Sequence, residues 1–161
     1  MRFLGGNGLF LFYLIALIIV VIDQVTKAII VRTMALSETI PLIEGVFHIT
    51  SHRNRGAAFG ILQDARVFFI IVTIIVVAAI IWYMPRLRQH KLSLTALSLI
   101  LGGAVGNFID RLLQGEVVDF LDFRLINFPI FNVADSAIVI GVSLLLLDSL
   151  RESKRSPSQG D

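Results

Sequence analysis

The chain has 161 residues, of which 56% are hydrophobic, and its mean hydropathy is +0.84. A soluble domain of this length cannot bury so much apolar surface, so we expect lipid to be its main solvent. The absence of cysteine excludes disulfide bonds and thiolate chemistry. The net charge of +2 is small and no basic run alternates with aromatic residues, so we expect no nucleic-acid partner.

Four apolar runs follow one another along the chain, at about 9–31, 67–84, 92–113 and 132–150. Because about 20 residues cross the hydrocarbon core of a bilayer, each run is long enough to span it. The first run is followed by no small-x-small cleavage site, so we expect an uncleaved span rather than a signal peptide. The sequence therefore predicts an all-α integral membrane protein with four transmembrane helices, forming a single domain over 1–152.

Basic residues indicate the orientation of these spans. Four spans put both termini on one side of the membrane, and the 85–91 connection lies on that side too. The cations on this side are Arg2, Arg86, Arg88, Lys91, Arg151, Lys154 and Arg155. The positive-inside rule then places both termini in the cytoplasm, although the opposite side also holds arginines. The polar segment 153–161 is predicted to be a disordered cytoplasmic tail.

Two connections lie on the other, extracytoplasmic side. The first, at about 38–62, is rich in β-branched and aromatic residues and is interrupted by Pro41, Gly45 and Gly56. This composition favours short strands, which would form a small β-cradle on the membrane surface. The second, at 114–131, is expected to be a short outer loop or helix, with Pro129 in an extended lead-in to the last span.

Several polar residues interrupt the first and third spans. Asp23 and Lys27 stand at i and i+4, which favours an ion pair on one helix face. A purely structural pair and a role in substrate positioning both remain open. Asn107, Asp110 and Arg111 share a face of the third span, where Arg111 is compatible with a buried network involving Asp110 or another carboxylate. A structural role is favoured for these residues, although Asn107 and Arg111 would also orient a substrate carbonyl if they faced the same cavity as Asp119 and Asp135.

The loop after the first predicted strands contains Asn54 and Gly56. An asparagine amide can bind an extended backbone and a glycine permits its close approach, although an ordinary turn explains the same residues. His48 and His52 stand four residues apart, but their surroundings predict strand and loop and no third ligand is near. We therefore expect no metal.

Asp119 and Asp135 are the most informative residues, because each lies in an apolar stretch where a span meets the membrane surface. Placing a carboxylate at the edge of the hydrocarbon costs free energy, and such residues are usually functional. Taken singly, Asp119 is compatible with a loop carboxylate and Asp135 with a helix N-terminal residue. Asn132 stands three residues before Asp135, and Asp119 is close by in the chain. Together they suggest acid–base chemistry at one membrane face.

Five segments resemble, in order, the motif blocks of the bacterial lipoprotein signal peptidase family, also called signal peptidase II. These segments are 23–27 (DQVTK), 54–60 (NRGAAFG), 106–111 (GNFIDR), 117–120 (VVDF) and 131–136 (FNVADS). The resemblance extends from about residue 23 to residue 141.

The resemblance implies an aspartic endopeptidase of the bacterial cytoplasmic membrane, acting near the extracytoplasmic face. It would cleave prolipoproteins just before a diacylglyceryl-modified cysteine, in contact with membrane lipid and without metal or organic cofactor. Because one chain carries a complete catalytic unit, we expect the monomer to be sufficient. Asp119 and Asp135 would be the catalytic pair, sharing a proton because two close carboxylates do not easily both ionise. The implied supporting residues are Asp23, Lys27, Asn54, Gly56, Asn107, Asp110, Arg111 and Asn132.

Two other functions use similar residues. A small proton-coupled transporter also needs intramembrane carboxylates and basic residues, but it predicts charges along a path through several spans. Here the second span carries no charge and the carboxylates gather toward one face. A structural assembly protein is the third possibility, and it would tolerate the isosteric loss of either aspartate.

Overall fold

The computed structural model describes residues 6–56, 61–126 and 128–155. Within this part of the chain, four helices are long and apolar enough to cross a membrane. They are α1 (Gly6–Thr33), α2 (Arg66–Tyr83), α3 (Lys91–Leu113) and α4 (Val133–Arg155), and a 3-10 turn, η2 (Met84–Leu87), follows α2. The predicted four-helix architecture is confirmed. Helix α4 continues past the predicted end of the span to Arg155, while residues 156–161 lie outside the described part.

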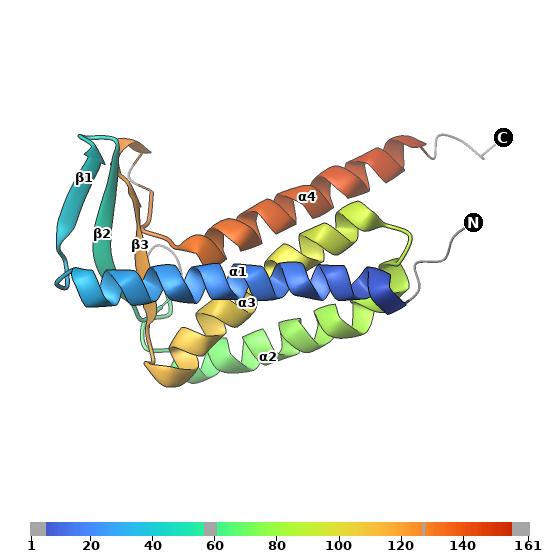
Figure 1. Ribbon diagram of the computed structural model, residues 1–161, viewed down its shortest axis with the longest axis horizontal. Coiled ribbons are helices and arrows are strands. Elements are labelled where there is room, and N and C mark those ends of the chain that lie inside the picture. The colour runs from blue at the N-terminus through green and yellow to red at the C-terminus, as the bar shows by residue number, and fades with distance from the viewer. Residues whose placement is uncertain (1–5, 57–60, 127, 156–161) are drawn as a thin grey trace.

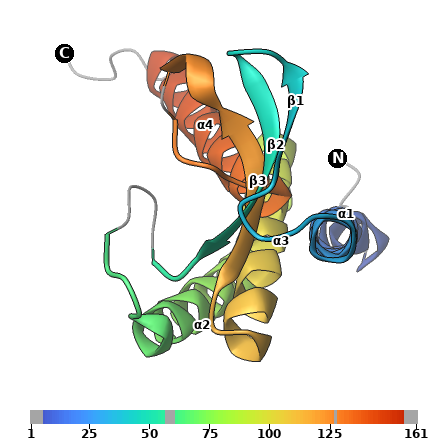
Figure 2. The same cartoon turned by 90° about the vertical axis from the view of Figure 1, so that its left-hand side faces the viewer.

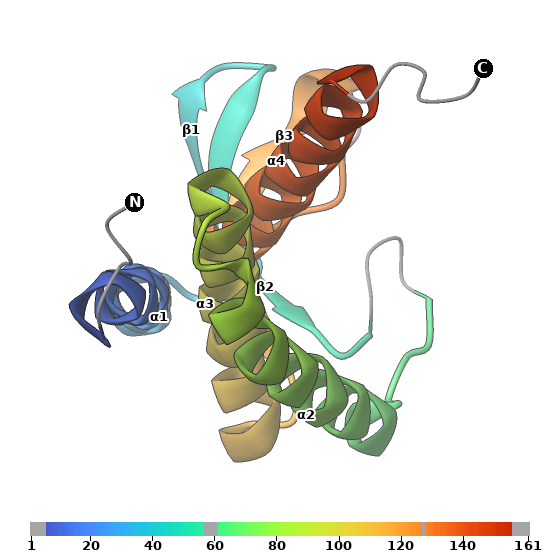
Figure 3. The ribbon, with the colours of Figure 1, turned by 90° about the vertical axis from the view of Figure 1, so that its right-hand side faces the viewer.

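Helix α3 is the centre of the bundle, and the other three helices pack around it (Figure 3). Its small residues allow this close packing. A Cβ on Gly102 would lie 2.7 Å from the backbone oxygen of Ala16 in α1, and one on Gly103 would clash with the backbone oxygen of Ala134 in α4. The glycines of α3 therefore permit the backbone-to-backbone approach typical of helices in lipid.

A three-stranded antiparallel sheet stands across one end of the bundle (Figures 1 and 2). Its order is β1 (Thr39–Ile43), β2 (Phe47–Asn54), then β3 (Val117–Phe123). The start of α1, the α2–α3 connection and the end of α4 lie at the opposite end of the bundle (Figure 1). The first two strands confirm the predicted small sheet, although β2 ends at Asn54 and residues 57–60 of that segment lie outside the described part.

The second outer segment was expected to be loop or helix, and it does contain a 3-10 turn, η3 (Arg124–Ile126), but Val117–Phe123 form strand β3 instead. Its residues pair with β2 across a long separation in sequence, for example Asp119 opposite His52 and Asp122 opposite His48. The free edge of β3 is partly covered by Phe131, whose backbone N–H donates to Leu121 O at 3.1 Å. The local sequence of this segment does not distinguish strand from loop, and pairing with β2 and Phe131 holds it extended.

Two apolar clusters join these elements. Ile30 of α1 and Met34, just after this helix, pack against Val118 and Phe120 of β3 and fix the sheet to the bundle. A second cluster lies within the helices around Met84. The outer faces of the helices stay apolar and exposed, as at Phe68 in α2. A soluble protein does not normally expose so continuous an apolar surface, so these faces are suited to contact with lipid.

Candidate active site

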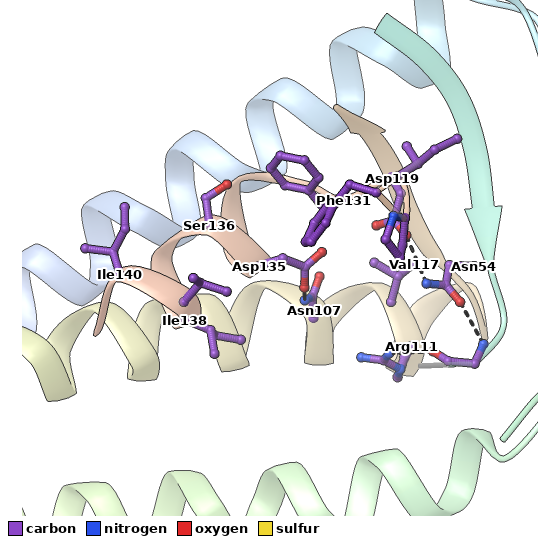
Figure 4. A pocket seen from close by; sticks show the side chains of 15 residues that line it. Asn54, Asn107, Arg111, Val117, Asp119, Phe131, Asp135, Ser136, Ile138 and Ile140 are labelled. Carbon is purple, nitrogen blue, oxygen red and sulfur yellow. Dashed lines mark hydrogen bonds between the residues drawn. The ribbon is translucent and has the colours of Figure 1, made fainter. Parts of the chain in front are cut away.

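A cavity of about 500 Å³ lies where the sheet meets α3 and α4 (Figure 4). Its polar wall is formed by predicted site residues from four segments of the chain, namely Asn54, Gly56, Asn107, Arg111, Asp119 and Asp135. Its other wall is apolar and consists of residues 128–131 and the outer face of the first turns of α4. The fold therefore brings both predicted catalytic aspartates to one cavity.

Asp119 projects from β3 and is only 1% exposed. The Asn132 side-chain amide donates to Asp119 Oδ1 at 2.7 Å, and the Asn54 amide donates to Asp119 Oδ2 at 3.0 Å. Burial, and then the nearby charge of Asp135, raise the pKa of Asp119 to about 7, against the opposing effect of these two hydrogen bonds. This carboxyl group is thus poised to gain or lose a proton near neutral pH.

Asp135 lies in the first turn of α4 and forms a capping box with Asn132. The Asp135 backbone N–H donates to Asn132 Oδ1 at 2.9 Å, and the Asn132 backbone N–H donates to Asp135 Oδ2 at 3.2 Å. The Asn107 amide donates to Asp135 Oδ1 at 2.7 Å. The side chain of Asp135 is therefore fixed at a helix N-terminus, where a negative charge is favoured.

The amide of Asn107 has an orientation that its neighbours determine. Lys27 Nζ and Asn132 Nδ2 donate to Asn107 Oδ1 at 2.9 and 3.1 Å. Both neighbours are donors, so the oxygen of Asn107 faces them and its NH₂ group faces Asp135. The two asparagines thus connect the two aspartates through their side-chain amides.

Lys27 is the centre of a buried charge cluster behind this pair of asparagines. Its Nζ lies 2.8 Å from Asp23 Oδ2 and 2.9 Å from Asp110 Oδ2. The predicted Asp23–Lys27 ion pair is present, but it extends to α3 through Asp110. Asp23 also accepts from the backbone N–H of Ala134 at 2.9 Å, so α1 helps to hold the N-terminus of α4.

Among the residues that the structure describes, Arg111 forms no ion pair with Asp110, which corrects that part of the predicted network. Its Nη2 donates to Gly56 O at 3.1 Å, and its guanidinium carbon lies 4.5 Å from the centre of the Phe69 ring. Gly56 N in turn donates to Asn54 Oδ1 at 2.9 Å, which turns the Asn54 NH₂ group toward Asp119. Arg111 and Gly56 thereby help to orient a hydrogen-bond donor to Asp119.

Sequence reasoning missed Gln24 as a member of this cluster. Its Nε2 donates to Asp110 Oδ1 at 2.9 Å and to Gly106 O at 3.1 Å, linking α1 to α3. Its position in an apolar span, beside Asp23, was the signal available. The apolar wall was missed as well, because Phe128 to Phe131 carry no chemical group that marks a site.

His48 and His52 both lie in β2 and neither lines the cavity. Among the described residues, no three His, Cys, Asp or Glu side chains are placed to hold a metal ion. The expectation of a site without metal or organic cofactor stays a prediction.

The family model described as "Signal peptidase (SPase) II" matches residues 15–151. The chain belongs to the signal peptidase II family. It is 60% identical over 147 residues to a lipoprotein signal peptidase of Brevibacillus brevis, covering 90% of this chain and 98% of the relative. It is 49% identical over 152 residues to a protein of the same name from Halalkalibacterium halodurans, covering 92% of this chain and 97% of the relative.

Solved structures support the same assignment. A bacterial membrane enzyme determined at 2.3 Å superposes with a TM-score of 0.87 and 40% identity, covering 99% of this chain and 97% of that one. A second, determined at 1.9 Å, gives a TM-score of 0.80 and 43% identity over 92% and 96% of the two chains. These matches confirm the predicted family and make the chain a multi-pass membrane protease.

Proposed function

We propose that this member of the family removes signal peptides from prolipoproteins with Asp119 and Asp135 acting as a water-activating pair. The observation that carries the proposal is the convergence of these two carboxylates on one cavity, each held by side-chain amides. Asp135 raises the pKa of Asp119, so the two groups influence each other electrostatically and share one proton.

The surroundings give the two carboxyl groups different roles. Asp119, whose pKa is raised to about 7, holds the shared proton in the resting enzyme. We assign the role of base to Asp135, because its position at a helix N-terminus and its hydrogen bonds from Asn107 and from the Asn132 backbone N–H favour the ionised form.

The reaction then follows from these protonation states. Asp135 takes a proton from a water molecule, whose oxygen bonds to the scissile carbonyl carbon while Asp119 protonates the carbonyl oxygen. In the tetrahedral intermediate the carbon–nitrogen bond breaks, and the departing amine takes the proton now held by Asp135. As the carbonyl re-forms, its hydroxyl proton returns to Asp119, so one water is consumed and both aspartates are restored.

The apolar wall of the cavity supports a lipid-modified substrate. Ile138, Val139 and Ile140 continue the cavity from Asp135 along α4, and Val139 and Ile140 are largely exposed. Acyl chains lying along this face would bring a diacylglyceryl-modified cysteine next to the aspartates. Cleavage would then fall just before that cysteine.

We also propose an orientation and an oligomeric state. The sheet lies at the end of the bundle opposite the basic α2–α3 connection (Figure 1), and the cavity is lined by residues of β2 and β3 in this sheet. The positive-inside rule assigns that basic end to the cytoplasm, with both termini, and the active site to the extracytoplasmic face of the cytoplasmic membrane. A single chain supplies every residue around the cavity, so the monomer is sufficient for activity.

Purified enzyme can be incubated with a diacylglyceryl-modified precursor and, in parallel, with the same precursor lacking the lipid. We expect a gel shift only for the modified precursor, and mass spectrometry of its products should place the cut on the amino side of the modified cysteine. Equal cleavage of both precursors would contradict the role of the apolar wall. A cut at another bond would contradict the proposed placement of the substrate.

A further inference from the structure

The end of the bundle opposite the cavity carries a group of exposed cations, which we call the basic end. It consists of Arg86, Arg88, Lys91 and Arg151. Arg86 and Arg88 lie in and just after η2, Lys91 begins α3, and Arg151 lies near the end of α4. Figure 3 shows this end of the bundle from the outside. No step of the proposed cleavage reaction uses these residues.

Within the described part of the chain, none of these four cations forms an ion pair with a carboxylate. The two carboxylates of α4 at this end already have other partners. Glu152 Oε1 lies 3.0 Å from His90 Nδ1, and Asp148 accepts a hydrogen bond from Ser93. The basic end therefore presents a net positive charge that the protein itself does not neutralise.

Arg86 is held in a defined position beside an aromatic ring. Its guanidinium carbon lies 3.6 Å from the centre of the Trp82 ring, and its Nη1 donates to the backbone oxygen of Trp82. One N–H group is used in this way, which leaves the others of the planar guanidinium to bind an external anion. Trp82 is 64% exposed and Tyr83 is 47% exposed. Such rings, at the end of a membrane-spanning helix, lie at the level of lipid head groups.

We propose that the basic end binds the head groups of anionic phospholipids, with the Arg86–Trp82 pair as its centre. The phosphate oxygens accept from Arg86, and the neighbouring cations attract the negative charge that distinguishes these lipids from zwitterionic ones. The basic amino-terminal region of a signal peptide is not the occupant, because the same cations repel it.

Trp82 is the only tryptophan in the chain, so its fluorescence reports directly on this site. The purified full-length protein can be reconstituted into vesicles of equal parts phosphatidylglycerol and phosphatidylcholine, with bromine on the acyl chains of one lipid or of the other. We expect brominated phosphatidylglycerol to quench Trp82 more strongly than brominated phosphatidylcholine. Raising the salt concentration should reduce this difference, because exposed charges are screened.

The triple variant Arg86→Gln/Arg88→Gln/Lys91→Gln should lose the preference, with a decrease of roughly fivefold or more in relative affinity for phosphatidylglycerol. The ratio of quenching by the two lipids is compared, so a change in the fluorescence of Trp82 itself cancels. Arg32→Gln is the matched control, because it removes an exposed cation near the opposite end of α1. Retained precursor cleavage shows that each variant is folded.

Equal quenching by the two brominated lipids in the wild-type protein would overturn the proposal. A preference that the triple variant retains would overturn it as well. Counting the phospholipids that stay bound in native mass spectrometry gives a second measurement, in which the wild-type protein should retain phosphatidylglycerol and the triple variant should not.

Discussion

The side-chain amide of Asn132 donates to Asp119 Oδ1 at 2.7 Å, and this hydrogen bond links strand β3 to the start of helix α4. The oxygen of the same amide accepts from the backbone N–H of Asp135 at 2.9 Å. One buried side chain thus positions both aspartates. Its Nδ2 donates to Asp119 and its Oδ1 caps α4, so a substitution that removes only one of these contacts can distinguish the two roles.

Asn132→Ser should retain the cap of α4 but remove the donor to Asp119, because a serine hydroxyl accepts from a helix N–H as well as asparagine does. We expect kcat to fall roughly tenfold, which is about the value of one hydrogen bond, with little change in thermal stability. Asn132→Ala should lower both. A wild-type kcat in Asn132→Ser would show that the amide serves only to cap the helix.

The pKa of Asp119 predicts how stability changes with pH. In the unfolded chain this carboxyl group has the ordinary pKa of 3.8, and folding raises it to about 7. Between these values the folded state binds more protons than the unfolded state, so stability falls as the pH rises from about 4 to 7. Asp119→Asn should therefore flatten the dependence of Tm on pH between about 4 and 7 in detergent.

The control for this measurement is Asp64→Asn, which changes a carboxylate that is 76% exposed. This variant should keep the wild-type dependence of Tm on pH. If Asp119→Asn keeps it too, proton binding at Asp119 does not contribute to stability as proposed.

Lys27→Met should destabilise the protein strongly, because it leaves the buried carboxylates of Asp23 and Asp110 without their cation. Breaking a buried ion pair in this way costs about 3–5 kcal/mol. Turnover per folded molecule should fall less, since Asn132 still orients the Asn107 amide. Tm in detergent and the single-turnover rate measure the two effects, with Lys91→Met as an exposed control. An unchanged Tm with lost turnover would instead place Lys27 in the catalytic machinery.

Gly103→Ala should reduce precursor cleavage by pushing the start of α4 away from α3. The new methyl group would meet the backbone of Ala134, next to Asp135. Gly102→Ala is the matched control, since its methyl group would meet Ala16 and Ile19 of α1 instead. Both should lower Tm, but Gly103→Ala should lower the turnover of folded enzyme further. Equal turnover in the two would show that the α3–α4 contact does not position Asp135.

The sequence predicted the features that depend on local pattern. Span length, the i, i+4 spacing of Asp23 and Lys27, and the position of the first two strands all follow from residues that are close in the chain. The motif blocks added the aspartate pair and most of the supporting residues. The pairing of Lys27 with Asp110 was not predictable in this way, because it depends on how α1 packs against α3.

Strand β3 was not predictable from local sequence either. Its residues pair with residues of β2 that are far away in the sequence, as Asp119 does with His52, and no local signal connects them. Gln24 was missed because a single amide in an apolar span does not reveal which groups it will meet. In contrast, the capping box of Asn132 and Asp135 could have been recognised from the i, i+3 spacing alone.

Single-turnover cleavage of a diacylglyceryl-modified precursor by Asp119→Asn and Asp135→Asn tests the central claim most directly. Asp148→Asn, at the far end of α4, serves as the matched control. We predict no detectable product from either active-site variant and wild-type cleavage by the control, with all three proteins folded as judged by a cooperative thermal transition in detergent. Cleavage near the wild-type rate by either Asp119→Asn or Asp135→Asn would contradict the aspartate pair.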